Sequence, residues 1–188
     1  ATGVVPDITR CVTMDAKAAG DLVYVLGTTR DELGGSEYYD HFGYTGRNVP
    51  VVRPTEFLPA YRALHRAISE ELIASVHGVY KGGLGVHLAL VAMGGNLGMK
   101  LSLGRVPAEG IDRDDTLLFS ESAGRFIISV DPSQKARFEE VFGGLPLECI
   151  GSITDDGRMT VEGQGGQTLL SAPVADLSSP SPGLRPTS

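Results

Sequence analysis

A nearly continuous apolar run, GLGVHLALVAM at residues 83–93, constrains the fold of this chain more than any other segment. His87 is its one strongly polar residue, so a helix formed by this run has no polar face to turn toward water. Gly94 and Gly95 follow directly and are typical of a helix end. The apolar part is about half as long as a membrane span. We therefore expect a buried helix that packs on a sheet inside a water-soluble domain.

Apolar and β-branched runs elsewhere predict the strands of that sheet, at residues 8–14, 22–26, 76–80, 97–103, 125–130, 147–153, 159–161 and 168–170. Further helices are expected at residues 31–41, from Pro54 onward, and from Asp131 through residue 142. The helix that Pro54 opens has an apolar face of Phe57, Leu58, Tyr61, Leu64, Ile68 and Leu72. Because βα units alternate with strands that follow one another directly, we expect an α+β fold with a mixed sheet and packed helices.

The size and charge of the chain narrow its class and its partners. Its 188 residues fit one domain, expected at residues 1–172, followed by a Pro- and Ser-rich tail at residues 173–188. With 16 basic and 23 acidic residues the net charge is −7, which argues against a nucleic-acid partner. Cys11 and Cys149 fit no metal-ligand spacing, and no signal peptide opens the chain. We therefore expect a cytoplasmic protein without a membrane partner.

The start of the chain suggests that it is part of a longer protein. It lacks an initial Met and opens almost directly into a patterned segment.

Two short segments carry the polar groups that suggest a ligand site. SVHGVYKGGL at residues 75–84 combines His77 and Lys81 with Gly82 and Gly83 at the start of the apolar helix. Paired glycines there let backbone N–H groups approach a phosphate, although they also serve close packing of a strand and a helix. His77 could act as a general base or a phosphate donor, or could simply fix the turn.

The second segment, LFSESAGRF at residues 118–126, supplies hydroxyls and charges just before a strand. Ser120, Glu121 and Ser122 could accept from a ribose, hold a cation through oxygen, or only order a tight loop. Arg125 could bind a phosphate or pair with Glu121. No base stands beside either serine in sequence, so no catalytic residue is expected. The eight residues named in these two segments are our candidates for nucleotide or phosphate binding, and no metal site is expected.

Four segments together resemble the C-terminal half-domain of the AIR synthase-like superfamily, in the form found in phosphoribosylformylglycinamidine synthases. They are GDLVYVLGTTRDELGGSEYY (20–39), HGVYKGGLGVHLALVAM (77–93), LGMKLSL (97–103) and LLFSESAGRFIISV (117–130). Their order and spacing agree as well, over roughly residues 8–170. GGSEYY and LFSES are the specific pieces, because other superfamily members such as thiamine-monophosphate kinase and selenophosphate synthetase usually lack them.

The resemblance implies an enzyme of two fused repeats, each with an N-terminal ATP-binding half and a C-terminal half. This ligase of purine biosynthesis converts formylglycinamide ribonucleotide, ATP and glutamine-derived ammonia to the amidine, through an iminophosphate. The HxxxKGG and LFSES-GR forms are typical of the second repeat. For the full enzyme the resemblance implies ATP or ADP and magnesium as cofactors. The implied partners are the ATP-binding half-domain, the first repeat, and a glutaminase subunit or domain.

The chain departs from the first-repeat pattern after His77. An acidic residue ligates magnesium there in the first repeat, whereas this sequence has Gly78, so magnesium binding is not expected at that position. An ESQ-type segment contacts substrate in the first repeat. Here Ser120–Ser122 is expected either to bind a nucleotide at a non-catalytic site or to shape a domain interface. The isolated chain is expected to be inactive, because the ATP-binding half is missing from it.

The rival interpretation is a non-catalytic scaffold or dimerisation module. An aromatic cluster beside glycines supports it, since aromatic residues are enriched at interfaces. Its members are Tyr38, Tyr39, Phe42 and Tyr44. A homodimer therefore remains open among the partners.

Overall fold

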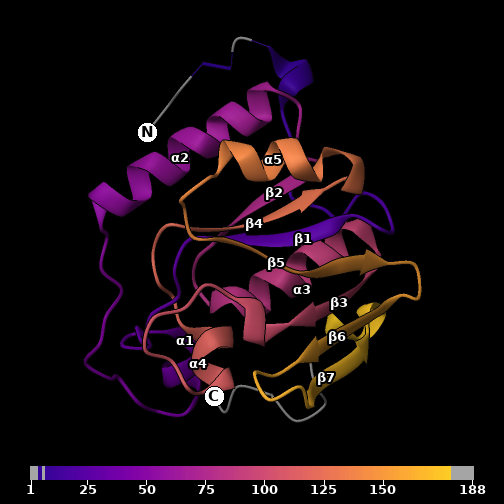
Figure 1. Cartoon of the computed structure of the whole chain (residues 1–188). Coiled ribbons are helices and arrows are strands. Elements are labelled where there is room, and N and C mark those ends of the chain that lie inside the picture. The colour runs from indigo at the N-terminus through magenta and orange to yellow at the C-terminus, as the bar shows by residue number, and fades with distance from the viewer. Residues whose placement is uncertain (1–3, 6, 179–188) are drawn as a thin grey trace.

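The computed structural model describes residues 4–5 and 7–178 and shows one seven-stranded sheet with helices on both faces (Figure 1). The strands are β1 (Leu22–Leu26), β2 (Ser75–Val79), β3 (Gly98–Ser102), β4 (Arg125–Val130), β5 (Leu147–Thr154), β6 (Arg158–Glu162) and β7 (Thr168–Pro173). Their spatial order is β2-β4-β1-β5-β3-β6-β7. The β3–β6 pair is parallel and the other pairs are antiparallel. The expected α+β class with a mixed sheet is confirmed.

The described α-helices form two layers around the sheet. They are α1 (Glu37–His41), α2 (Pro54–Ser69), α3 (Gly83–Gly95), α4 (Asp114–Phe119), α5 (Lys135–Val141) and α6 (Val174–Leu177). α2 and α5 cover one face, and α3 and α4 lie on the other (Figure 1). Side chains of a strand alternate between the faces, so Val23 and Val25 join the core under α3, whereas Tyr24 and Leu26 join the core under α2. Two separate apolar cores therefore share one sheet.

The apolar helix forms as expected, but it is not buried on every side. Leu84 and Leu88 of α3 are 0% exposed and pack against the sheet, whereas Val86 is 41% exposed and Leu90 is half-buried. The expected burial against the sheet is therefore confirmed for the side of α3 with Leu84 and Leu88, whereas the side with Val86 is exposed. A helix that lies on one sheet face, flanked by α4 and α6, keeps an outer stripe that nothing in the described chain covers.

The helix that Pro54 opens buries only part of its expected apolar face. Its buried residues are Ala60, Leu64 and Ala67, whereas Leu58 and Tyr61 are 45% and 52% exposed. The small alanines let α2 lie close to the sheet, and that orientation turns two larger apolar side chains outward.

Local capping accounts for the elements that differ from the sequence expectation. Residues 8–14 are not a strand: they begin with a 3-10 turn, Ile8–Arg10, in which the Asp7 side chain accepts from the backbone N–H of Thr9. The helix expected at residues 31–41 is limited to α1, because the Ser36 side chain caps it by accepting from the N–H of Tyr39. One helix was not expected from the sequence: α4, whose first turn contains Asp114 and Asp115.

The packed part of the chain extends beyond the expected boundary at residue 172. β7 ends at Pro173 and leads directly into α6, where Val174 is 3% exposed. The part of the expected tail at residues 173–178 thus contributes to the core under α3. The rest of it, residues 179–188, lies outside the described residues. Within residues 4–5 and 7–178, no helix is both long enough and apolar enough to cross a membrane.

Candidate functional site

Three loops that are distant in sequence meet at one end of the sheet. β2 and β1 both pair with β4 in antiparallel fashion, so the ends of β2 and β1 lie beside the start of β4. The loops are residues 27–36 after β1, residues 80–82 before α3, and residues 120–124 before β4. Both polar segments singled out from the sequence therefore contribute to the same region.

Glu121 joins the two segments directly. Its Oε1 atom accepts from the backbone N–H of Gly82 at 2.8 Å and from that of Glu37 at 3.0 Å. The Gly82 N–H considered for phosphate binding is therefore already bonded to a carboxylate of the chain itself. Lys81 projects from the same turn, with its side chain 75% exposed, and forms an ion pair with Glu37. Its hydrogen bond to Glu37 raises the pKa of Lys81.

Arg125 does not face a ligand. It is 1% exposed, and its guanidinium donates to Ser122 O at 3.0 Å, Thr29 Oγ1 at 2.9 Å and Ser120 O at 2.5 Å. Neither alternative drawn from the sequence holds, because Arg125 contacts neither open solvent nor the Glu121 carboxylate. Burial lowers its pKa to about 10, although the charges of Glu32 and Glu121 act in the opposite direction.

The two serines are also internal. Ser120 and Ser122 are 0% and 1% exposed. The Ser120 hydroxyl donates to Arg30 O at 2.6 Å, and Ser122 Oγ accepts from the Arg30 N–H at 3.0 Å. Ser120 Oγ also accepts from the N–H of Glu32 at 3.3 Å. These bonds fix the loop after β1 against the loop before β4, so the loop-ordering interpretation describes both hydroxyls.

His77 pairs with His87 across the turn between β2 and α3. The N–H of Tyr80 donates to His87 Nε2 at 3.0 Å, with Lys81 O a weaker contact of the same nitrogen at 3.2 Å. His87 Nδ1 and His77 Nε2 lie 2.8 Å apart and share one hydrogen bond, whose donor depends on the tautomers of the two rings. Burial lowers the pKa of both imidazoles, and for His77 the charge of His87 adds to the effect. Both rings thus fix the turn as a neutral pair.

Gly83 permits a close approach of α3 to α4. Its φ is +73°, and a Cβ added there would lie 2.6 Å from the Phe119 carbonyl carbon. Gly82, at φ +91°, would place a Cβ 3.0 Å from Val86. Gly83 therefore serves close packing, one of the two roles considered for the glycine pair. The positive φ angles favour glycine at both Gly82 and Gly83.

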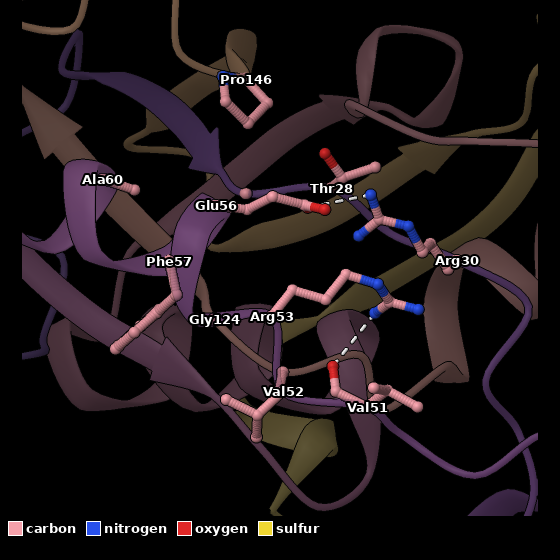
Figure 2. A pocket seen from close by; sticks show the side chains of 12 residues that line it. Thr28, Arg30, Val51, Val52, Arg53, Glu56, Phe57, Ala60, Gly124 and Pro146 are labelled. Atoms are coloured by element: carbon pink, nitrogen blue, oxygen red, sulfur yellow. Dashed lines mark hydrogen bonds and ion pairs between the residues drawn. The ribbon is translucent and has the colours of Figure 1, made fainter.

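Beside this network lies a hollow of about 190 Å³ whose residues the sequence analysis did not single out. In Figure 2 the Glu56 side chain points toward Arg30, and Phe57 is another of the residues that line the hollow. Arg30 pairs with Glu56 at 2.9 Å and Glu109 at 2.8 Å, and Arg53 pairs with Glu32 at 2.9 Å. The one sequence signal for this hollow was the polar GTTR run directly after β1. Among the described residues no group of three or more His, Cys, Asp or Glu side chains could hold a metal ion.

Residues 18–164 match the family described as AIR synthase related protein, C-terminal domain, and the chain belongs to this family. Among curated relatives, it is 41% identical over 144 residues to the phosphoribosylformylglycinamidine synthase subunit PurL of Thermococcus sibiricus, covering 77% of this chain and 20% of that protein. It is 37% identical over 167 residues to the PurL subunit of Methanothrix thermoacetophila, covering 86% of this chain and 21% of that one. The chain thus spans about a fifth of the length of these relatives.

Solved structures agree on the fold. Thermotoga maritima PurL complexed with FGAR matches with a TM-score of 0.79 and 20% identity, over 95% of this chain and 32% of that chain. The same protein complexed with ADP matches with a TM-score of 0.74 and 20% identity, over 91% and 27%. The family and the fold implied by the sequence resemblance are therefore confirmed.

Proposed function

We propose that this chain is the C-terminal AIR synthase-type domain of the second repeat of a phosphoribosylformylglycinamidine synthase. The observation that carries the proposal is the 41% identity with a PurL subunit over 144 residues. In the complete enzyme the domain would take part in the ATP- and glutamine-dependent conversion of formylglycinamide ribonucleotide to the amidine. A scaffold or dimerisation role is not favoured, since the chain resembles synthase subunits over most of its length.

In this proposal the domain works with other parts of the enzyme. The ATP-binding half-domain and the first repeat would hold ATP or ADP and magnesium, and a glutaminase partner would supply ammonia in the cytoplasm. One structural neighbour is described as a PurLQS assembly, and others as PurL complexed with ATP or ADP, which supports partners and a nucleotide. The arrangement of the candidate residues supports a positioning role, because most of them hold loops together.

The local role that we propose is contact with a phosphate-bearing ligand through Lys81. Lys81 is the one exposed cation on the turn of residues 80–83, and its partner Glu37 is itself half-exposed. Glu121, His77 and Arg125 would then act as positioning residues, because they fix the turn from inside the domain. Gly82 and Gly83 give the turn its left-handed backbone.

A chimera tests both levels of the proposal. The matching segment of the Thermococcus sibiricus subunit is replaced by this chain, and amidine formation is measured with ATP, ammonia and formylglycinamide ribonucleotide. We expect activity well above that of the subunit lacking the segment, and no turnover by the isolated chain. A chimera no more active than the deletion control, or steady turnover by the repeatedly purified chain alone, would contradict the proposal.

The lysine is tested within the chimera by charge reversal. Lys81→Glu should raise the KM for one phosphate-bearing substrate about tenfold, equivalent to ~1.4 kcal/mol of binding. Lys100→Glu is the matched control, because Lys100 is similarly exposed and paired, with Glu162, but lies on β3. Equal KM values for the two variants would remove Lys81 from the site.

A further inference from the structure

The flank of α2 presents more apolar surface than an isolated domain needs. Tyr61 and Leu58 on α2 are 52% and 45% exposed, and Tyr80 at the end of β2 is 63% exposed. Val51 and Val52, just before α2, are 49% and 66% exposed. Scattered apolar residues are normal on a protein surface, but contiguous ones mark interaction sites.

These side chains surround hollows that share walls. The hollow of about 190 Å³ described above shares Phe57, Ala123 and Gly124 with a second one of about 460 Å³. The second hollow is also lined by Tyr61 and Tyr80. We call the two together the α2 groove. Both hollows are mostly apolar in their lining, as a groove that receives side chains of a partner would be.

A further hollow lies at the far end of the same flank. A third hollow, of about 810 Å³, shares Tyr61 and lies between α2 and the start of the chain. Val4, Val5 and Val12 form its opposite wall, and none of them belongs to a helix or a strand. Val4 and Val5 are themselves 92% and 60% exposed, so this end of the flank is open as well.

Most charged side chains around the groove are paired within the chain or buried. Arg30 is paired with Glu56 and Glu109, and Arg53 with Glu32. At the other end, Lys81 is paired with Glu37. The Glu121 carboxylate accepts from two backbone N–H groups, and Arg125 is buried. Apart from Lys81 at the rim, the ionic groups of the groove are paired within the chain or buried, so its interior complements an uncharged surface.

We propose that the α2 groove receives an extended, uncharged apolar segment from another domain of the same synthase polypeptide. The inference rests on the proposed function, because it is the longer enzyme that supplies the segment, and the relatives are about five times as long as the match. Apolar side chains of that segment fill the hollow between Phe57 and Tyr80. Tyr61 and Tyr80 become covered, so this flank is the surface through which the domain is held in the enzyme.

Hydroxyl-radical footprinting tests this directly. The modification rates of Tyr61 and Tyr80 are compared between the isolated chain and the chimera described above. We expect both rates to fall about tenfold in the chimera, as removal from solvent requires. Leu169 on β7, which is 40% exposed at the opposite edge of the sheet, is the internal control and should keep its rate. Unchanged tyrosine rates in the chimera overturn the proposal.

Variants separate docking from indirect effects. In the chimera, Tyr61→Glu should restore the Tyr80 rate to that of the isolated chain, whereas Leu169→Glu should not. Activity is recorded in parallel. An inactive chimera with protected tyrosines contradicts the proposed function but supports the docking of a segment in the α2 groove. An active chimera with unprotected tyrosines supports the proposed function but contradicts the docking.

Two measurements on the isolated chain complete the test and do not depend on the chimera. An apolar fluorescent dye should bind the open groove, and Tyr61→Glu should reduce its signal by at least about half, whereas Leu169→Glu should not. Equal dye signals in the two variants overturn the proposal. Sedimentation should show a monomer. A dimer that Tyr61→Glu dissociates would assign the groove to a second copy of the chain and overturn the proposal as well.

Discussion

Replacing Arg125 by lysine should destabilise the domain strongly, although the charge is kept. The guanidinium satisfies three oxygen acceptors that lie around its plane, on Thr29, Ser120 and Ser122. A lysine ammonium is a single point on a flexible stem, so it can replace one of these bonds well and leaves about two buried acceptors unsatisfied. Each such acceptor costs about 1–3 kcal/mol, which gives an expected loss of ~3 kcal/mol.

The measurement is urea denaturation followed by circular dichroism, with Tm as a second readout. For a domain of this size ~3 kcal/mol corresponds to a fall in Tm of about 6–12 °C. Arg158→Lys is the matched control, because Arg158 is exposed and bonds the Ser171 carbonyl at the surface, so its change should stay within about 0.5 kcal/mol. If the free energy of unfolding of Arg125→Lys lies within about 1 kcal/mol of that of the parent, the planar guanidinium of Arg125 does not hold the loops together, and its positioning role is refuted.

Three further outcomes are expected. Leu88→Ala should lower the free energy of unfolding by about 2–5 kcal/mol because Leu88 is fully buried, whereas Val86→Ala on the exposed side of the same helix should lower it by under ~1 kcal/mol. Equal losses for the two variants in denaturation would contradict the packing of α3. Gly83→Ala should lower the free energy of unfolding by at least ~1 kcal/mol more than Gly20→Ala, because both glycines have positive φ but only a Cβ at Gly83 would clash with backbone atoms. Equal losses would argue against the close approach of α3 to α4. The pKa values of His77 and His87 are lower in the folded chain than in the unfolded chain, so below about pH 6.5 the unfolded chain binds more protons. The free energy of unfolding should therefore fall as the pH drops from 7 toward 5. His87→Gln should flatten this pH dependence, whereas Val86→Ala should not.

The elements that the sequence predicts well are those whose signal is local. The strand at residues 22–26 and the strand at residues 125–130 are found as β1 and β4, and the helix from residue 83 is found as α3. In these runs the period of apolar residues and the flanking glycines settle the conformation. Residues 8–14 have an apolar pattern that favours a strand, but the Asp7 side chain caps a 3-10 turn at their start, and the turn forms instead of the strand.

The destination of each polar group was decided only by the tertiary structure. Glu121 and Gly82 are 39 residues apart, yet the bond between them occupies the N–H that the glycine pair suggested for a ligand. Arg125 sits five residues from Ser120 on an apparent ligand loop, but its guanidinium points inward because Thr29, 96 residues away, completes its set of acceptors. Residue type and spacing determined that hydroxyls, a carboxylate and cations would gather near these glycines. Whether such groups bond one another or a ligand depends on contacts between distant segments, which no local pattern encodes, since the same donors and acceptors satisfy either partner equally well.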